Sequence, residues 1–337
     1  MSERPVGAIL AAGLGTRMRP FTEVLPKPLL PFLNTPIIAY SIDHLYRAGV
    51  RRIGVNLHHL GEAIPPVVER IAAIYPDPVE LVFVEETTAR GTAGGIAGIW
   101  RALGRPRTTL VCLNGDSVMD VDLASELRHH RAEGAAATML TRPARGGHPG
   151  GVASDSRGNV VRLRDLRLKA GGRELDFMGV HLLEPETLVH VDAVGDKPGT
   201  PCMVGDVYMP WMERGIQPRA SVVDAFWVAL DTPQLLLDST QLCLAEPVVF
   251  PQSPAPTPIT IVSPSQVNDA ALVKPPVFLG AYASVGHGAR LGPGVCVDGT
   301  SIGPNTTVSD ALLYGMDRVE GTWTGCVAIS GKVVQVR

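Results

Sequence analysis

The sequence is poor in aromatic residues and in cysteine. Aromatic residues make up 5% of the 337 residues, whereas hydrophobic residues as a whole make up 45%. The core must therefore be built mainly from Leu, Val, Ile and Ala. The five cysteines are odd in number and are never spaced as Cys-x-x-Cys. This pattern argues against a disulfide framework or a zinc site and favours reduced thiols.

An excess of charge and long apolar runs are also missing. Lys and Arg number 30 against 33 Asp and Glu, which gives a net charge of −3. We therefore expect no nucleic acid polymer and no anionic membrane as a partner, because both attract basic proteins. No apolar run approaches the roughly 18 residues that a membrane-spanning helix needs. The N-terminus does not have the layout of a signal peptide, so we expect a soluble, cytoplasmic protein.

Short apolar runs and helix-period segments alternate along the first 140 residues. The expected strands are Val6–Ala12, Arg52–Leu57, Glu80–Val84 and Thr109–Leu113, and the expected helices are 35–49 and Gly94–Ala102. Such alternation predicts a doubly wound α/β fold with a mixed, mainly parallel sheet. Four closely spaced strands should extend the sheet in antiparallel fashion: Ala136–Leu140, Val160–Leu163, Leu175–Leu183 and Ala220–Ala229. A helix over Gln234–Ala245 would close this domain.

The composition changes after residue 246. Residues 247–276 carry eight prolines, which predicts an extended linker with one strand near Ile259–Val262. Beyond it, an aliphatic residue followed by a small or acidic one recurs about every six residues, at Leu279-Gly280, Val285-Gly286, Leu291-Gly292, Val297-Asp298, Ile302-Gly303 and Val308-Ser309. This hexapeptide repeat is typical of a parallel β-helix, here a short left-handed one. We therefore expect an α/β domain over 1–245, a Pro-rich linker over 246–276 and a β-helix over 277–337.

A β-helix of about three coils cannot bury both of its ends by itself. It should pack on the α/β domain or on a partner subunit, so we expect a homo-oligomer with the tail as the candidate contact. Acyltransferase activity in the tail has little support, because three coils leave little room for an acyl donor and His287 stands alone between glycines.

A glycine-rich loop follows the first expected strand and precedes a Pro-Lys-Pro segment. Small residues from Leu10 to Gly15 would let backbone N–H groups approach an anion closely. Arg17 adds a planar fork for phosphate oxygens and Lys27 adds a point charge. An ordinary glycine-rich turn is the alternative. Neither a dinucleotide fold nor a Walker A loop fits, because Met18 occupies the place of the third glycine and no Gly-Lys-Ser/Thr follows.

Residues 13–20 and 26–28 resemble the Gly-x-Gly-Thr-Arg-(Leu/Met)-x-Pro and Pro-Lys-Pro motifs of the sugar-1-phosphate nucleotidyltransferases. The resemblance implies that the nucleotide is held by Leu10, Ala11, Ala12, Gly13, Gly15, Thr16 and Arg17. It places Arg17 on the leaving pyrophosphate and Lys27 at the reacting phosphates, and it makes 1–245 the catalytic domain.

Three weaker motifs extend this resemblance. Asp116 follows Asn114-Gly115 after an apolar strand; the family's matching Asp binds Mg²⁺, although such a residue is often only a turn former. Gly91-Thr92 resembles the segment that reads the base, although Thr92 could instead cap a helix. Gly179 resembles the glycine that lies against the bound sugar, with Asn114 as a second sugar contact, although a bulged core strand is the alternative.

The sequence departs from the family pattern at two places. The family's Trp-x-Asp-x-Gly-Thr-Pro motif, whose Asp is a second Mg²⁺ ligand, reads Trp227-Val-Ala229-Leu-Asp231-Thr-Pro here. Asp231 remains a candidate ligand, but the favoured interpretation is that it caps the helix that starts at Pro233, with Thr232 as the other candidate cap. The Glu-Lys-Pro motif that supplies a lysine to the sugar phosphate is absent. Arg162, Arg164 and Arg167 are open as substitutes, and His58 and His59 are interpreted as loop residues.

The resemblance implies the reaction NTP + sugar 1-phosphate → NDP-sugar + pyrophosphate, with Mg²⁺ as cofactor. The motifs are most similar to those of mannose-1-phosphate guanylyltransferases, which favours GTP and mannose 1-phosphate. Transfer from dTTP or UTP to glucose 1-phosphate or another hexose phosphate stays open. Because of Ala229 and the missing Glu-Lys-Pro, a catalytically impaired regulatory homologue that binds nucleotide-sugars is the alternative function.

Overall fold

The computed structural model describes residues 4–145, 151–169, 171–246 and 257–336. Within this part, the chain forms two compact units. The first contains the residues up to Gly13 together with Ser41–Ala229, and the second contains Leu14–Tyr40 together with the residues from Leu230 onward. Residues 247–256 of the expected linker lie outside the described residues. The boundaries 1–245, 246–276 and 277–337 therefore stay predictions.

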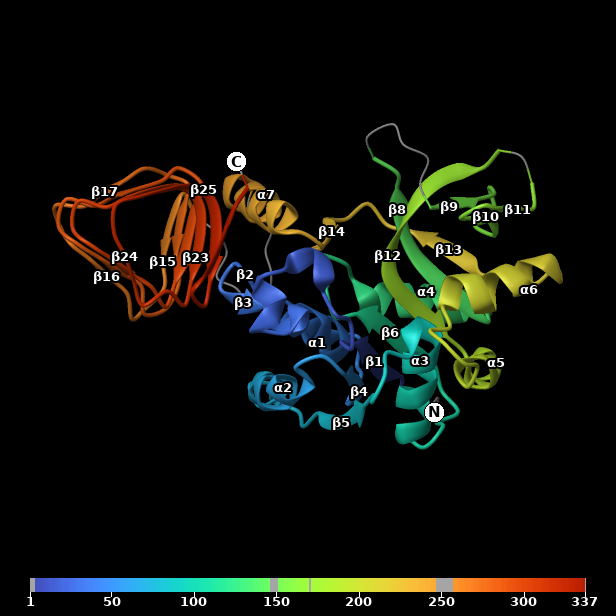
Figure 1. The fold of residues 1–337 in the computed structure, drawn as a ribbon. Coiled ribbons are helices and arrows are strands. Elements are labelled where there is room, and N and C mark those ends of the chain that lie inside the picture. Colours follow the sequence, from blue (N-terminus) through green and yellow to red (C-terminus); the bar gives the residue numbers. More distant parts are fainter. Residues whose placement is uncertain (1–3, 146–150, 170, 247–256, 337) are drawn as a thin grey trace. The chain divides into compact units, whose positions relative to one another are not determined.

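A mixed sheet forms the centre of the first unit (Figure 1). Its strands are β1 (Val6–Leu10), β4 (Arg52–Leu57), β5 (Glu80–Glu85), β6 (Leu110–Asn114), β8 (Ala137–Pro143), β9 (Val152–Ser154), β10 (Val160–Leu163), β11 (Leu166–Arg167), β12 (Arg173–Leu183) and β13 (Arg219–Val222). The order is β11-β10-β9-β12-β6-β1-β4-β5, and β8 pairs with both β12 and β13. β1 is parallel to β4 and β6, whereas β12 is antiparallel to β6, β8 and β9. The predicted α/β fold with a mixed sheet is confirmed.

One expected strand is divided in two. The segment predicted as Ala220–Ala229 forms β13 and then β14 (Trp227–Ala229), which pair with different partners. β13 runs parallel to β8, and β14 is antiparallel to β7 (Ser117–Met119). The prediction was wrong because the apolar pattern continues through the short non-strand residues 223–226.

The α-helices of the described residues are α1 (Ile37–Arg47), α2 (Ile64–Ala72), α3 (Gly91–Ala102), α4 (Leu123–Glu133), α5 (Pro185–Gly195), α6 (Met209–Glu213) and α7 (Pro233–Ala245). Shorter turns are the 3₁₀ segments Thr16–Met18, Phe21–Glu23, Lys27–Leu29 and Gly61–Ala63 and the π-helical segment Met203–Tyr208. α3 begins at Gly91, earlier than predicted, because buried apolar contacts outweigh the low helix propensity of its glycines. Within the described residues, none of the helices combines the length and the apolar character that a membrane crossing requires.

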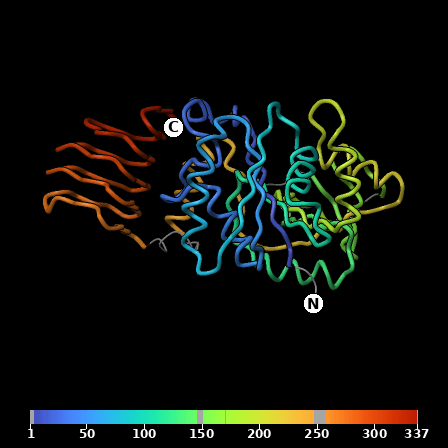
Figure 2. Tube along the Cα trace, turned by 90° about the horizontal axis from the view of Figure 1, so that it is seen from below, coloured from blue at the N-terminus to red at the C-terminus, as the bar shows by residue number. Residues whose placement is uncertain are grey.

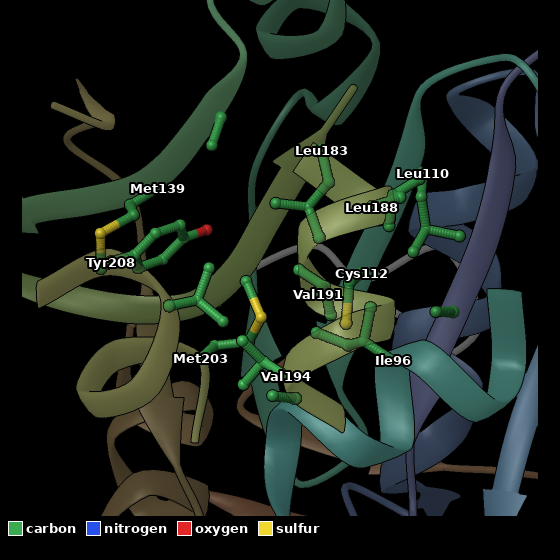
Figure 3. Close-up of a cluster of buried hydrophobic side chains, with 14 of the residues drawn as sticks. Ile96, Leu110, Cys112, Met139, Leu183, Leu188, Val191, Val194, Met203 and Tyr208 are labelled. Atoms are coloured by element: carbon green, nitrogen blue, oxygen red, sulfur yellow. The ribbon is translucent and has the colours of Figure 1, made fainter. Parts of the chain in front are cut away.

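Aliphatic side chains dominate the core of the first unit (Figure 3). Leu110 and Cys112 of β6 lie with Leu183 of β12 among residues of the helices that cover this part of the sheet, such as Ile96 of α3 and Val191 of α5. All five side chains are fully buried. This packing fixes the strands whose ends carry the candidate site.

Short parallel strands stack in the second unit (Figure 2). They are β15 (Ile259–Ile261), β16 (Gln266–Val267), β17 (Leu272–Val273), β18 (Val277–Leu279), β19 (Ser284–Val285), β20 (Arg290–Leu291), β21 (Val295–Asp298), β22 (Ser301–Ile302), β23 (Thr307–Tyr314), β24 (Arg318–Val319) and β25 (Thr322–Ile329). Val277 lies opposite both Ile259 and Val295, so these neighbouring rungs are 18 residues apart. β26 (Lys332–Gln335) returns antiparallel to β25, and β2 (Pro31–Phe32) pairs with β3 (Thr35–Pro36).

The stack begins earlier than the hexapeptide pattern predicts. Where an extended linker with one strand was expected, β15, β16 and β17 pair in parallel with β18, β19 and β20. Ile261, Val267 and Val273 in fact continue the six-residue spacing back from Leu279. The eight prolines of residues 247–276 conceal the repeat from an argument based on composition.

Candidate functional site

The ends of three parallel strands meet at one edge of the sheet in the first unit. Leu10, the last residue of β1, lies opposite Asn56 of β4 on one side and Asn114 of β6 on the other. The chain passes from β1 to β4 and β5 on one side of β1 before it returns to β6 on the other side. This reversal of strand order is the place where open α/β sheets bind ligands.

The backbone that leaves β1 is fixed by both neighbouring strands. Ala11 N donates to Asn56 Oδ1 at 2.7 Å, and Gly115 N donates to Leu10 O at 2.9 Å. Both polar groups of the peptide between Leu10 and Ala11 are therefore occupied by protein partners. This peptide sets the direction of the next residues, Ala12 and Gly13. The part of the predicted nucleotide loop that belongs to the first unit ends at Gly13.

Gly91 and Thr92 lie in the first turn of α3. Gly91 has a φ of 63°, and a Cβ there would lie 2.4 Å from Pro201 O. Only glycine fits so close an approach in this conformation. Thr92 Oγ1 accepts a hydrogen bond from Met203 N at 2.9 Å. The alternative in which Thr92 caps the helix is wrong, because Arg90 holds the N-cap position.

Asn114 and Gly179 are brought together. Gly179, in β12, has a φ of 76°, and a Cβ there would lie 2.8 Å from Asn114 Nδ2. The pairing of β12 with β8 is irregular between Phe177 and His181. The glycine thus permits a bulged strand to touch the end of β6, and both residues that the sequence assigns to the sugar belong to one contact.

Asp116 stands between β6 and β7 with its carboxylate beside Ser117. Ser117 Oγ donates to Asp116 Oδ1 at 3.4 Å. Ala229 lies opposite Ser117 in the β7–β14 pair, so the position where the family has a carboxylate offers no side-chain oxygen ligand. Among the described residues, no group of three or more His, Cys, Asp or Glu side chains could hold a metal ion. The Asp116 carboxylate is the kind of hard oxygen ligand that a divalent cation prefers, and its role as a metal ligand stays a prediction.

The rest of the nucleotide motif belongs to the second unit. Gly15 has a φ of 59°, and its carbonyl accepts a hydrogen bond from Thr22 Oγ1 at 2.9 Å. A Cβ at Gly15 would lie 2.8 Å from Thr22 Cγ2. The glycine therefore lets the loop fold tightly on itself before the 3₁₀ turn that contains Thr16 and Arg17.

Asp231 forms ion pairs with two cations of this segment, Lys27 and Arg17. Lys27 Nζ lies 2.6 Å from Asp231 Oδ1, and Arg17 Nη2 lies 3.0 Å from Oδ2. The Lys27 side chain is 8% exposed, whereas that of Arg17 is 69% exposed. The expectation that Asp231 caps the next helix is wrong: Thr232 is the N-cap of α7 and accepts from Leu235 N at 3.2 Å.

The three arginines proposed as substitutes have different surroundings. Arg162 is buried and paired with Glu174, and Arg164 Nη2 lies 3.4 Å from Cys202 Sγ. Arg167 is exposed. His58 Nδ1 is hydrogen-bonded to Glu86 O at 2.8 Å.

Sequence reasoning missed two polar residues near these positions. Asn56 ends β4 just as Asn114 ends β6, and this shared placement could have pointed to it. Arg142 of β8 donates to Trp227 O at 2.8 Å, and its guanidinium lies 4.7 Å from the centroid of the Trp227 ring. Burial lowers the pKa of Arg142. Only the strand pairings reveal that this cation lies across from Asp176, three residues before Gly179.

Comparisons with known proteins agree with these motifs. The family described as "Nucleotidyl transferase" matches residues 6–238. The UTP–glucose-1-phosphate uridylyltransferase of Synechocystis sp. is 26% identical, over 93% of this chain and 88% of that protein. The mannose-1-phosphate guanyltransferase of Hypocrea jecorina is 26% identical over 71% of this chain and 64% of that protein, so the matched part spans less than two thirds of it.

A solved structure supports the fold. The crystal structure of a putative glucose-1-phosphate thymidylyltransferase from Bacillus anthracis superposes with a TM-score of 0.59 and 18% identity, covering 73% of this chain and 97% of that one. The prediction of a nucleotidyltransferase enzyme is confirmed, because the family match extends over more than half of the sequence. The chain belongs to the nucleotidyl transferase family.

Proposed function

We propose that the chain transfers a nucleotidyl group from an NTP to a sugar 1-phosphate and releases pyrophosphate. The observation that carries the proposal is the meeting of Leu10, Asn56 and Asn114 at the strand edge where the order of the sheet reverses. The loops that continue from this edge contain the predicted nucleotide, sugar and metal residues of the first unit. GTP with mannose 1-phosphate is the first candidate pair, and UTP or dTTP with glucose 1-phosphate is the alternative.

The chemistry needs no covalent enzyme intermediate. A phosphate oxygen of the sugar 1-phosphate attacks the α-phosphorus in line, and the bond to the pyrophosphate oxygen breaks. The protein contributes positioning and charge stabilisation. Arg17 would bind the leaving pyrophosphate, and Lys27 would neutralise the phosphates at the reacting centre. Asp231 Oδ1 accepts a hydrogen bond from Lys27 Nζ at 2.6 Å, so Asp231 would orient the ammonium group.

Enzymes of this family generally use a divalent metal ion. We propose Mg²⁺, with Asp116 as its protein ligand and Asp231 as a second candidate. The ion would supply charge neutralisation of the phosphates. The ion pairs of Asp231 with Lys27 and Arg17 argue for a role in orienting these cations, and a ligand role for Asp231 stays the weaker proposal.

For the tail we propose a left-handed parallel β-helix that contributes to a homo-oligomer. The 18-residue rungs of three short strands support the β-helix. Ile259, Ile261 and Leu272 of the first rung are 41%, 51% and 56% exposed, which supports a contact at this end of the stack. Light scattering on the full chain tests the assembly, and a monomer at all concentrations would contradict it.

An assay of pyrophosphate release tests the reaction. The purified chain is incubated with Mg²⁺ and each pairing of GTP, UTP, dTTP and ATP with mannose 1-phosphate, glucose 1-phosphate and other hexose 1-phosphates. We expect release with one preferred pair. Binding of nucleotide-sugar without any release of pyrophosphate would instead support a regulatory homologue. Ala229 favours this alternative because the carboxylate that the family has at this position, opposite Ser117, is missing.

A further inference from the structure

A buried amide–carboxylate pair connects two loops of the first unit. Asn56 Nδ2 donates to Glu86 Oε1 at 2.8 Å. Asn56 is 3% exposed and Glu86 is 7% exposed. A buried carboxylate is costly unless hydrogen bonds compensate for its lost hydration. The other hydrogen bonds of Asn56 and Glu86 therefore indicate why a buried carboxylate is kept at this position.

Each member of the pair uses its second polar atom on the backbone of a different loop. Asn56 Oδ1 accepts from Ala11 N at 2.7 Å, and Glu86 Oε2 accepts from Arg90 N at 3.1 Å. One continuous chain of hydrogen bonds thus runs from the loop after β1 to the residue before Gly91. The two loops are those to which the sequence assigns the phosphates and the base of the nucleotide.

The helix that packs on this pair leaves room for it. A Cβ at Gly95 of α3 would lie 2.7 Å from Asn56 Nδ2 and 3.4 Å from Glu86 Oε1. A Cβ at Gly98, one turn further along, would meet only ordinary contacts at 3.6 Å. An alanine at Gly95 would therefore displace the amide, whereas an alanine at Gly98 would not.

We propose that Asn56 and Glu86 are positioning residues that hold residues 11–13 and 90–92 in the arrangement that binds the nucleotide. The inference deepens the proposed function and rests on it. Neither side chain needs to touch the substrate, because each acts through a backbone N–H group. Their removal should weaken nucleotide binding and leave the sugar 1-phosphate largely unaffected.

The pattern of donors and acceptors supplies a sharp test. In Asn56→Asp, two carboxylates face each other. In Glu86→Gln, the NH₂ group of the new amide faces another N–H donor, either the amide of Asn56 or the backbone N–H of Arg90. In the double variant Asn56→Asp/Glu86→Gln, the carboxylate accepts from Ala11 and from the new amide, whose oxygen accepts from Arg90. Every hydrogen bond is restored with the amide and carboxylate exchanged.

The four proteins are compared by KM for the preferred NTP, KM for the sugar 1-phosphate, kcat and Tm. We expect each single variant to raise the nucleotide KM about tenfold or more, with the KM of the sugar phosphate within about twofold. The double variant should return the nucleotide KM to within about threefold of wild type. The matched control is another amide–carboxylate pair, Gln234 and Asp238 of α7, where Gln234→Glu should leave both KM values unchanged.

Two results would overturn the inference: folded single variants with an unchanged nucleotide KM, or a double variant no better than the singles. If a single variant does not fold, the comparison of Gly95→Ala with Gly98→Ala decides. Gly95→Ala should raise the nucleotide KM, whereas Gly98→Ala should not. Equal nucleotide KM values for these two variants would also overturn the inference. If wild type releases no pyrophosphate with any pair, the proposed function fails. Calorimetric affinities of GTP and UTP for the same variants then test the inference with the same expected pattern.

Discussion

Lys27 and Asp231 form an ion pair in the second unit, with 2.6 Å between Nζ and Oδ1, although 204 residues separate them in the sequence. The ammonium group is nearly buried, so the carboxylate compensates for its lost hydration. Asp231 stands at the position where the family motif has glycine, two residues after the missing family carboxylate. The shifted carboxylate thus has a new partner, the lysine of the Pro-Lys-Pro segment.

This pair predicts opposite effects for its two members. Lys27→Met should lower kcat by about 10²–10³, with little loss of stability because Arg17 still pairs with Asp231. Asp231→Ala should lower the free energy of unfolding by about 3 kcal/mol, since it removes the carboxylate that lies 2.6 Å from the nearly buried Lys27 ammonium. Urea unfolding and pyrophosphate release measure the two effects. Asp317→Ala, at an exposed position of the same unit, should change neither, and equal destabilisation by Lys27→Met and Asp231→Ala would contradict the prediction.

The missing family carboxylate predicts a gain of metal affinity. Ala229→Asp places a carboxylate opposite Ser117, the neighbour of Asp116. An added anionic ligand should lower the Mg²⁺ concentration for half-maximal rate by about tenfold, whereas Asp116→Ala should abolish turnover. Ala229→Asn matches the added side chain in size without its charge. If Ala229→Asn lowers the Mg²⁺ requirement as much as Ala229→Asp, the effect does not come from the charge of an added carboxylate ligand.

Local patterns made much of this site predictable. The glycine loop, Asn114 and Gly179 lie within short motifs, and the alternation of strands and helices fixes which strand ends share an edge. The Lys27–Asp231 pair lay beyond such reasoning, because a contact between residues so far apart depends on how the second unit folds. Without that contact, the local rule for helix caps favoured the wrong role for Asp231.

Two other features were missed for different physical reasons. Asn56 stands alone at the end of a strand, and its importance shows only in the register that places it beside Leu10. The first rung of the stack was hidden because prolines suggested an extended linker, although Ile261 and Val267 kept the six-residue spacing. The proline content of this segment thus outweighed the six-residue spacing, which begins before residue 277, where the repeat was predicted to start.

Substitution of Gly179 can separate the effect of backbone strain from the loss of a sugar contact. Gly179→Ala combines a positive φ, which costs about 1–2 kcal/mol, with a Cβ placed 2.8 Å from Asn114 Nδ2. Gly171→Ala has the same backbone cost at a φ of 78°, with no atom within 4 Å of the added Cβ. We expect both variants to lose stability in urea unfolding, but only Gly179→Ala to raise the KM of the sugar 1-phosphate. Equal KM values for the two variants would argue against a sugar contact at Gly179.

Asp298 predicts a pH dependence of stability. Burial raises its pKa to about 6, although the N–H of Gly299 opposes the shift. Between about pH 4, the ordinary range of the unfolded carboxyl, and pH 6, the native chain binds more protons than the unfolded chain. The contribution of this group to the free energy of unfolding therefore falls as the pH rises through that window and is constant above it.

Urea unfolding of wild type and Asp298→Asn at pH 4.5 and pH 7 measures this contribution. We expect wild type to lose stability relative to the variant between the lower and the higher pH. Asp317→Asn, which removes an exposed carboxylate of the same unit, should show no such change relative to wild type. A stability difference between wild type and Asp298→Asn that is the same at both pH values would contradict the assignment.

Cys202 should be the most reactive of the five thiols. Partial burial opposes ionisation of its thiol, but the N–H groups of Gly205 and Val204, the Thr92 hydroxyl and the Arg164 guanidinium outweigh it, so the pKa is lowered. Burial instead raises the pKa of Cys112 and Cys326, and it raises that of Cys243 and Cys296 to about 12. Because the thiolate is the nucleophile, iodoacetamide should alkylate Cys202 first, as peptide mass spectrometry would show.

The role of Arg164 in this reactivity can be isolated with a matched pair of variants. Arg164→Ala removes the guanidinium that lies 3.4 Å from Cys202 Sγ and should slow the alkylation several-fold. Arg167→Ala removes an exposed arginine from the end of β11 and should leave the rate unchanged. Both variants lower the net charge equally, so a long-range electrostatic effect would slow both to the same extent. That result, or faster labelling of Cys326, would contradict the prediction, because the local hydrogen bonds and the adjacent cation would then not control the thiolate.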